Sequence, residues 1–163
     1  MITIRDYEKS DAQVVGLLIK DTYSEFNLDF LTAEELPPFL GPFAFAGQED
    51  LERLADIHAV ILSEMVLVAE ADRQIAGVLR GRLNRLGSLF VAKQYHHRGI
   101  GTALVKHFEA AVRKQGGQVI RVAATQYAVP FYLEMGYKKS TGVRRGWSFQ
   151  GHGIPIQPMK KVL

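Results

Sequence analysis

Hydrophobic residues follow two different periodicities along this chain. Short apolar runs, rich in β-branched and aromatic residues, predict strands. Apolar residues that recur every three or four positions predict helices with one buried face. In order, the pattern predicts a strand, a helix, an irregular segment, a helix, three strands, a helix, a strand, a helix and two strands. The clearest of these elements cover residues 1–7, 12–23, 49–63, 65–69, 75–79, 86–91, 103–113, 118–123 and 154–159.

The ends and faces of these elements give more specific expectations. Ser10 or Asp11 is expected to cap the first helix. The prolines within 154–159 favour an edge strand or a bulge over a central strand. The apolar faces of the first two helices are expected to include Val14, Val15, Leu17, Leu18 and Tyr23, and Leu51, Leu54, Ile57, Val60 and Ile61.

Between residues 24 and 47 the periodicity breaks, and phenylalanines occur among prolines and glycines. Loops usually lie on the surface, so this composition is unusual for a connection. One interpretation is a loop that its aromatic residues fold onto the core. The other is an apolar lid over an acceptor pocket, or part of a dimer contact. The aromatic residues concerned are Phe26, Phe30, Phe39, Phe43 and Phe45.

A strand, a basic turn with two glycines and a helix follow one another from Leu86 to Arg113. Backbone N–H groups and the positive end of the helix dipole point outward at such a helix start, which predicts an anion site suited to phosphate. Gly99 and Gly101 let a bulky phosphate approach the backbone. Arg98, with His96 and His97 if they are protonated, would add positive charge.

Two common phosphate-binding patterns do not fit this turn. The P-loop needs Gly-Lys-Ser/Thr, whereas Gly101 is followed by Thr102 and Ala103. The dinucleotide fingerprint needs a third glycine three residues after Gly101, where this chain has Leu104. The sequence therefore predicts a pyrophosphate-binding turn of another kind.

The turn resembles the acyl-CoA-binding motif of the GCN5-related N-acetyltransferase (GNAT) superfamily. That motif reads Gln/Arg-x-x-Gly-x-Gly/Ala after a strand that ends in Leu-x-Val, and here Leu89-Phe90-Val91 and Gly99-Ile100-Gly101 match it. His96 stands at the Gln/Arg position. A second block, 125–137, is similar to the family's Asn-x-x-Ala-x-x-Phe-Tyr-x-x-x-Gly-Phe signature. It matches at Ala128, Phe131, Tyr132 and Gly136, with Thr125 in place of the Asn.

The resemblance implies a mixed, mostly antiparallel α/β sheet of six to seven strands with helices on both faces. It also implies a splay between the fourth and fifth strands, 86–91 and 118–123, in which CoA lies. Acetyl-CoA would be the cosubstrate, with no metal. The residues expected to bind it are Leu89, Phe90, Val91, His96, His97, Arg98, Gly99, Ile100, Gly101, Thr102, Thr125, Ala128, Phe131 and Tyr132.

The same resemblance implies transfer of an acetyl group to a primary amine of a small molecule or a peptide. Direct attack is favoured, because the chain has no cysteine and no recognisable nucleophile constellation. A backbone N–H near Phe90 or Val91 would stabilise the oxyanion, and Tyr132 would protonate the departing thiolate. No base is assigned. A water chain or a relay through His97 is possible, and Glu25, Glu64 and Glu70 are candidates by position only.

Composition limits the number of domains and the classes of protein to which this chain can belong. The chain has 163 residues, 47% hydrophobic and 23% charged, which suits one globular domain over 1–163. The lack of cysteine excludes disulfides and permits a cytoplasmic location. No apolar stretch approaches the ~20 residues of a membrane span, so no membrane partner is expected.

The net charge of +3 is too weakly clustered for a nucleic-acid surface. Arg80 and Arg82 would share a strand face, with Arg85 on the opposite face if the strand ran straight through Asn84. A non-catalytic acyl-CoA-binding sensor or subunit is the alternative function, and a homodimer is possible.

Overall fold

The computed structural model shows eight strands in one mixed sheet across the described backbone, in the order β1-β2-β3-β4-β5-β8-β6, with β7 also paired to β8. It describes the backbone of residues 1–163 and the side chains of 1–146 and 149–163. The strands are β1 (Ile2–Asp6), β2 (Met65–Ala71), β3 (Gln74–Arg82), β4 (Arg85–Val91), β5 (Val119–Thr125), β6 (Lys138–Lys139), β7 (Arg144–Ser148) and β8 (Gly151–Val162).

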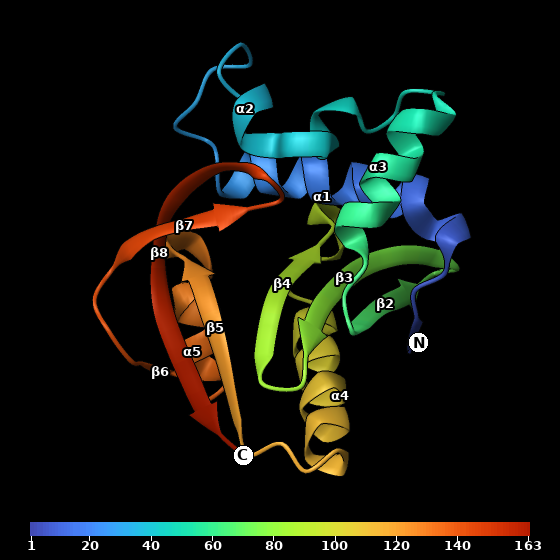
Figure 1. The fold of residues 1–163 in the computed structure, drawn as a ribbon. Coiled ribbons are helices and arrows are strands. Elements are labelled where there is room, and N and C mark those ends of the chain that lie inside the picture. The colour runs from blue at the N-terminus through green and yellow to red at the C-terminus, as the bar shows by residue number, and fades with distance from the viewer.

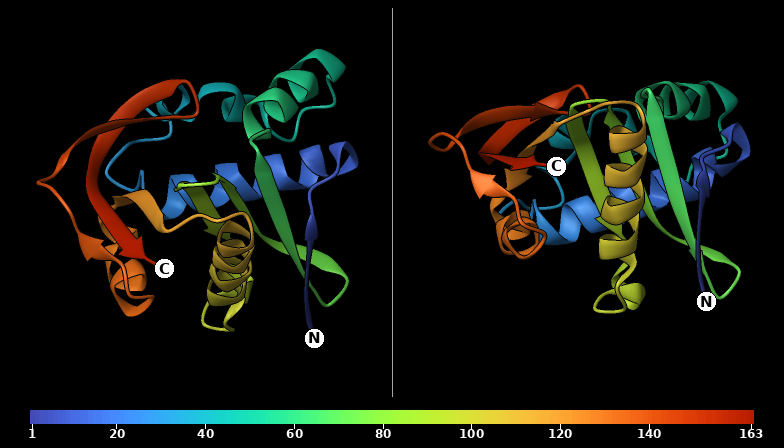
Figure 2. Two further views of the ribbon diagram at one scale, coloured as in Figure 1. Left: turned by 60° about the horizontal axis from the view of Figure 1, so that its bottom comes forward. Right: turned by 90° about the horizontal axis from the view of Figure 1, so that it is seen from below.

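Helices cover both faces of the sheet (Figures 1 and 2). α1 (Ala12–Phe26), α2 (Pro37–Leu40) and α3 (Leu51–Ile61) pack with the 3-10 turn η2 (Gly41–Phe45) on one face. α4 (Ile100–Lys114) and α5 (Val129–Glu134) pack on the other. Shorter 3-10 turns are η1 (Lys9–Asp11), η3 (Lys93–Tyr95) and η4 (Gln126–Ala128). In the described part of the chain, no helix has the length and apolarity that crossing a bilayer requires.

The parallel strands β4 and β5 separate soon after they begin. They pair only at Arg85 with Arg121 and at Leu86 with Val122 in the described backbone. All the other strand pairs are antiparallel, and Figure 1 shows the gap between β4 and β5 widening toward their carboxyl ends. The predicted mixed sheet with a splay between the fourth and fifth strands is confirmed, with eight strands instead of six to seven.

The expectation for the last strand was wrong. β8 is not an edge strand, because β5 lies on one side of it and β6 and β7 lie on the other. The two prolines are tolerated in β8 because each lies where its pairing with a neighbouring strand begins or is interrupted. Pro155 precedes Ile156, the first residue of β8 that pairs with β5, and Pro158 lies opposite the break between β6 and β7.

The hairpin between β3 and β4 changes the expected placement of the arginines. The chain turns at residues 83–84, so Arg82 lies directly opposite Arg85, and Arg80 lies opposite Ser88. Directly opposite residues share a face, so Arg85 does not lie on the far side from Arg82. The opposite placement of Arg85 depended on a straight strand through Asn84, and the turn there means that this condition is not met.

Two details of the first helices also differ from expectation. Val14 is 50% exposed and Leu51 is 87% exposed, so neither belongs to the packed face of its helix. The predicted faces hold farther along, where Val15, Ile57 and Ile61 are buried. Asp11 does occupy the N-cap position of α1, but its carboxylate does not cap that helix. It accepts the N–H of Glu8 instead, at 2.8 Å.

The Asp11 carboxylate also receives two hydrogen bonds from the Arg5 guanidinium, at 2.8 and 3.0 Å. These bonds lower the pKa of Asp11, despite the opposing effect of its burial. A depressed pKa stabilises the fold above the unfolded-state value near 3.9, and the contribution disappears as pH falls through the folded-state value. We expect Asp11→Asn to lower the free energy of unfolding by about 1–2 kcal/mol at pH 7. Urea unfolding curves measure this directly.

The difference between the parent and Asp11→Asn should shrink as pH falls below the unfolded-state value and through the lowered folded-state pKa, because the parent carboxyl becomes protonated over that range. Asp6→Asn serves as the control, since no ion pair of the Asp6 carboxylate occurs in the described part of the chain. A difference that stays constant down to pH 3 would contradict the assignment to this ion pair.

Candidate active site

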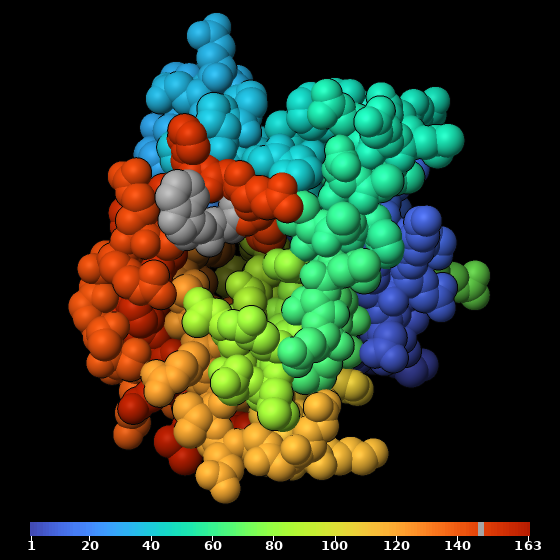
Figure 3. Space-filling view, in the orientation of Figure 1, coloured from blue at the N-terminus to red at the C-terminus, as the bar shows by residue number. Residues whose placement is uncertain are grey.

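The opening between β4 and β5 is a cleft of about 790 Å³. Its walls come from the last turn of α1, the length of β4, the turn into α4, the end of β5, α5 and the β7–β8 hairpin. In Figure 3 the surface is hollowed between β4 and that hairpin. Because β4 is unpaired to β5 beyond Leu86, backbone groups of both strands are available to a bound molecule.

The glycine turn lies at one end of this cleft. Gly99 is the N-cap of α4 and has φ of 79°, a left-handed conformation that glycine adopts without a Cβ penalty. No side chain caps this helix and its first turn carries no acidic residue. Gly99, Ile100, Gly101 and Thr102 all line the cleft. The first N–H groups of a 15-residue helix therefore meet the cavity, as an anion site requires.

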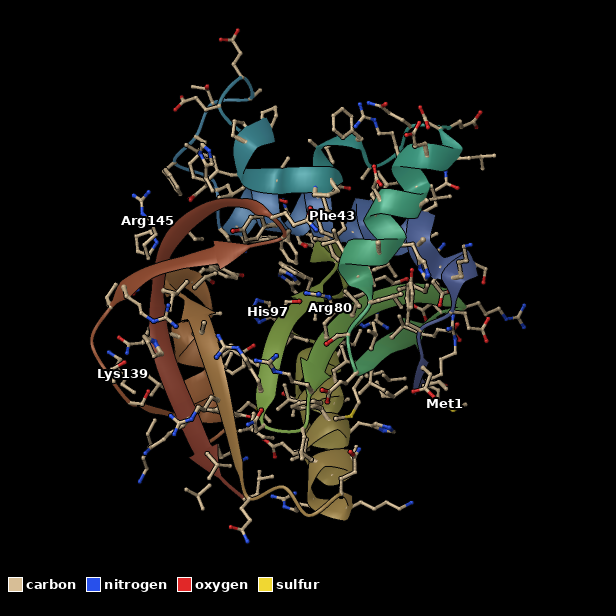
Figure 4. All side chains as sticks on the ribbon, in the orientation of Figure 1. Met1, Phe43, Arg80, His97, Lys139 and Arg145 are labelled. Carbon is tan, nitrogen blue, oxygen red and sulfur yellow. The ribbon has the colours of Figure 1, made fainter. Side chains whose placement is uncertain are left out.

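The structure brings almost all of the predicted cofactor residues together. Every one except Arg98 lines the cleft: Leu89, Phe90, Val91, His96, His97, Gly99, Ile100, Gly101, Thr102, Thr125, Ala128, Phe131 and Tyr132. Arg98 instead reaches Asp72, with both terminal nitrogens 3.3 Å from Oδ2, and lies over the Tyr95 ring. The neighbouring His97 stands in the opening between β4 and β5 (Figure 4).

His96 ties the turn to the strand before it. Its Nε2 lies 2.7 Å from the Val91 carbonyl oxygen, so this nitrogen carries a proton and donates it. The ring packs on Phe26, at 4.9 Å between centroids, and Phe26 packs on Tyr127. The histidine at the Gln/Arg position therefore holds the end of β4 against the turn, through contacts that also bring in the end of α1.

The free edge of β4 can be assigned from its hydrogen bonds. The N–H of Ala92 donates to Ala76 beside β3, at 2.8 Å, whereas the Val91 carbonyl accepts from His96. Groups of successive strand residues face opposite edges. The backbone groups of Leu89 and Val91 therefore face the cleft, and those of Phe90 face β3. Of the two predicted oxyanion donors, the geometry favours Val91 over Phe90 and adds Leu89.

Tyr132 lies on α5 with 4% of its surface exposed, and it lines the cleft. Burial raises the pKa of its hydroxyl, so the phenol keeps its proton at neutral pH. Its ring packs edge-to-face on Tyr137, at 5.5 Å between centroids. The Tyr137 hydroxyl donates to Glu109 at 3.2 Å, whereas the Tyr132 hydroxyl has no such partner among the described side chains. Tyr132 thus presents an uncommitted proton donor to the cavity.

None of the three carboxylates named as possible bases lines the cleft. Glu25 pairs with Lys93, Glu70 pairs with Arg5, and Glu64 accepts the N–H of Leu83 at 3.4 Å. Glu134 is the one carboxylate among the described lining residues. The side chains that the structure describes contain no cluster that could hold a metal ion.

Sequence reasoning missed several residues of the cleft that lie outside the two motifs. Thr22, Tyr23 and Asn27 come from the end of α1, and Arg85 and Ser88 come from β4. The β7–β8 hairpin adds Arg144 and Phe149. These residues lie far apart in the sequence and carry no local motif. The phenylalanines of 24–47 divide as well: Phe43 is fully buried and fits the core-cover interpretation, whereas Phe30 is 62% exposed.

Comparison with known proteins agrees with this geometry. A protein-family model described as the acetyltransferase (GNAT) domain matches residues 48–163. The chain belongs to this family. The predicted family is thereby confirmed, and with it GNAT acetyltransferase membership at the level of the family.

Solved structures show the same fold over almost the whole chain. A GCN5-related N-acetyltransferase from Rhodopseudomonas palustris is 21% identical, with 99% of this chain and 95% of that chain covered and a TM-score of 0.77. The PaiA N-acetyltransferase from Thermoplasma acidophilum is 21% identical, covers 100% and 99%, and has a TM-score of 0.72. An aminoglycoside 6'-N-acetyltransferase is 15% identical, covers 98% and 96%, and has a TM-score of 0.61. The last two were solved in complex with coenzyme A.

Proposed function

We propose that this GNAT chain is an acetyl-CoA-dependent N-acetyltransferase that acts on a primary amine of a small molecule or a peptide. The observation that supports this most is the convergence of three features in one cleft: the helix start at Gly99, the unpaired edge of β4 and the Tyr132 hydroxyl. Anion binding, carbonyl stabilisation and proton donation are what acetyl transfer from a thioester needs.

In this proposal, different parts of the cleft bind different parts of acetyl-CoA. The N–H groups at Gly99–Thr102 receive the pyrophosphate, because they are the unpaired donors at the positive end of α4. The free edge of β4 at Leu89 and Val91 receives the amide-bearing pantetheine arm. Thr125, Ala128 and Phe131 form the opposite wall. His97 lies close enough to the turn to add charge when protonated, whereas Arg98 contributes only through the field of its pair with Asp72.

The chemical step follows from the same residues. The neutral amine nitrogen attacks the thioester carbonyl carbon, a carbon–nitrogen bond forms, and the carbon–sulfur bond then breaks. A backbone N–H of Leu89 or Val91 donates to the carbonyl oxygen as it becomes negative. Tyr132 gives its proton to the departing sulfur, and its raised pKa favours refilling of that proton from solvent. The proton of the amine leaves through water, because the acceptor side of the described cleft has no carboxylate.

The test is acetyl-CoA turnover with a panel of primary amines, measured as release of free thiol, together with calorimetric binding of acetyl-CoA. We expect binding in the micromolar range, with a Kd between about 1 and 100 μM, and amine-dependent thiol release. Binding without turnover of any amine would indicate the alternative, a non-catalytic acyl-CoA sensor or subunit. No binding would contradict both functions. A cytoplasmic location, a single domain over 1–163 and a homodimer stay predictions.

A further inference from the structure

The acceptor side of the cleft carries an unusual charge arrangement. Arg85, at the start of β4, and Arg144, on β7, both line the cavity. No ion pair of either arginine occurs in the described part of the chain, although Arg5, Lys93, Arg98 and Lys161 all have carboxylate partners. Two cationic side chains thus meet the cavity without a counter-charge from the described protein.

The two arginines come from opposite walls. Arg144 pairs across to Ile156 of β8, and Gly146 pairs with Ile154. All four residues line the cleft, since alternate strand residues share a face. The pKa of Arg85 is lowered by its burial, and then by the charges of Arg82 and Arg144. The positive charges of Arg85 and Arg144 therefore act on each other, and neither has a carboxylate partner in the described part of the chain.

Ser88 completes this end of the cleft. Arg80 donates to its Oγ at 3.3 Å, so the Ser88 hydroxyl is an acceptor in that bond and keeps its own proton for another partner. Arg80 is itself fixed by the carbonyls at the end of α3, with 2.7 Å to Val60 and 2.7 Å to Ile61. An oriented O–H donor thus lies on the same strand as Arg85.

This charge cannot serve the pyrophosphate of the cosubstrate. Arg85 begins β4, and the glycine turn follows its other end at Val91. Six residues at ~3.3 Å each place the two ends of the strand roughly 20 Å apart. At that distance the Arg85 guanidinium cannot contact a pyrophosphate bound at the glycine turn. Arg85 is therefore available to the other substrate, together with Arg144, whose charge acts on it.

We infer that Arg85, Ser88 and Arg144 form a carboxylate-binding subsite, and that the acceptor is an amine that also carries a carboxylate. Arginine is suited to this role because its planar guanidinium donates two parallel hydrogen bonds to a carboxylate. Tyr23, Phe90 and Phe149 pack together beside the subsite and supply an apolar wall. The inference rests on the proposed function, since it assigns the second substrate of that reaction.

The test compares each acceptor with its own neutral amide. Phenylalanine and the dipeptide Gly-Phe are offered as free carboxylates and as C-terminal amides, with spermidine as a cationic acceptor. We expect kcat/KM to be at least about 10-fold higher for a carboxylate than for its amide, since a charge-assisted pair of bonds is lost. Preference for the amino acid or for the dipeptide then separates a small-molecule acceptor from a peptide. Equal rates with the carboxylate and the amide, or a preference for spermidine, would overturn the inference.

The variant Arg85→Gln/Arg144→Gln should lose that preference, with kcat/KM for the carboxylates about 10- to 100-fold lower and the Kd of acetyl-CoA unchanged. The matched control is Lys139→Gln/Arg145→Gln, which also removes two positive charges. Both side chains are exposed and lie on the outer side of the molecule, Lys139 on β6 and Arg145 on β7, away from the cleft (Figure 4). The same loss in the control would show a general charge effect and would overturn the inference.

A binding measurement distinguishes failure of the proposed acetyltransferase activity from failure of the carboxylate subsite. If acetyl-CoA binds but no amine is acetylated, calorimetry in the presence of CoA compares N-acetylphenylalanine with its amide. Tighter binding of the carboxylate, lost in Arg85→Gln/Arg144→Gln, supports the subsite on its own. Equal binding of the two molecules overturns it.

Discussion

Gly101→Glu is expected to weaken acetyl-CoA binding by at least about 100-fold, or about 2.7 kcal/mol. The new carboxylate would stand in the first turn of α4, where it would repel the pyrophosphate and compete for the same N–H groups. The fold should tolerate the change, because a Cβ at this position meets Phe131 at 3.4 Å and Val91 at 3.7 Å, which are ordinary contacts. Calorimetric titration with acetyl-CoA gives the Kd.

Two further variants make this result interpretable. Gly101→Ala adds the Cβ without the charge and should bind within about threefold of the parent, because its contacts are ordinary. Gly142→Glu adds the same charge in open space, where nothing lies within 4 Å of a Cβ. Its binding should be unchanged. If Gly101→Glu is folded and binds as well as Gly142→Glu, the anion site is not at this turn.

Tyr132→Phe is expected to lower kcat by about 100-fold and to leave the KM for acetyl-CoA within about twofold. The substitution removes only the hydroxyl that the proposal uses to protonate the thiolate, and the ring keeps its packing on Phe131 and Tyr137. Since burial raises the pKa of Tyr132, the parent should show no loss of kcat from its ionisation up to about pH 10. Steady-state rates of thiol release over this range measure both effects.

Tyr137→Phe is the matched control. It removes the hydroxyl of the neighbouring tyrosine, which donates to Glu109 and does not line the cleft. We expect this variant to lose about 1 kcal/mol of stability and to keep its kcat. Equal losses of kcat in the two variants would assign the effect to packing, and Tyr132 would then be a contact residue and not an acid.

Local patterns were sufficient to predict the part of the cleft that is proposed to bind acetyl-CoA. The strand 86–91, the glycines and the helix after them are contiguous, so their relation is set by spacing alone. Phe131 and Tyr132 could be added because a second short motif carries them. The sheet order and the splay came from the family resemblance, since no local periodicity specifies which strands separate.

The proposed acceptor subsite could not be predicted in the same way. A hairpin turn at residues 83–84 and the pairing of β7 with β8 bring Arg85 and Arg144 to one cleft, and both are tertiary features. Residues so far apart in the sequence show no local pattern that would pair them. The prolines of β8 also favoured an edge strand over the central position that brings Arg144 to the cleft. Arg98 does not line the cleft for a related reason: the Asp72 side chain, 26 residues away in the sequence, pairs with it.

The splay between β4 and β5 bears on how this protein resists aggregation. Unpaired strand edges invite other chains to add strands, which leads to aggregation. Here the edges of β4 and β5 that are free beyond Leu86 and Val122 face each other inside the molecule. The end of α1, the segments that follow both strands, and the β7–β8 hairpin surround them. A second sheet has no straight approach to these edges, whereas a slender, flexible chain does. The fold can therefore keep a row of unsatisfied backbone groups ready for a ligand while denying it to neighbouring proteins.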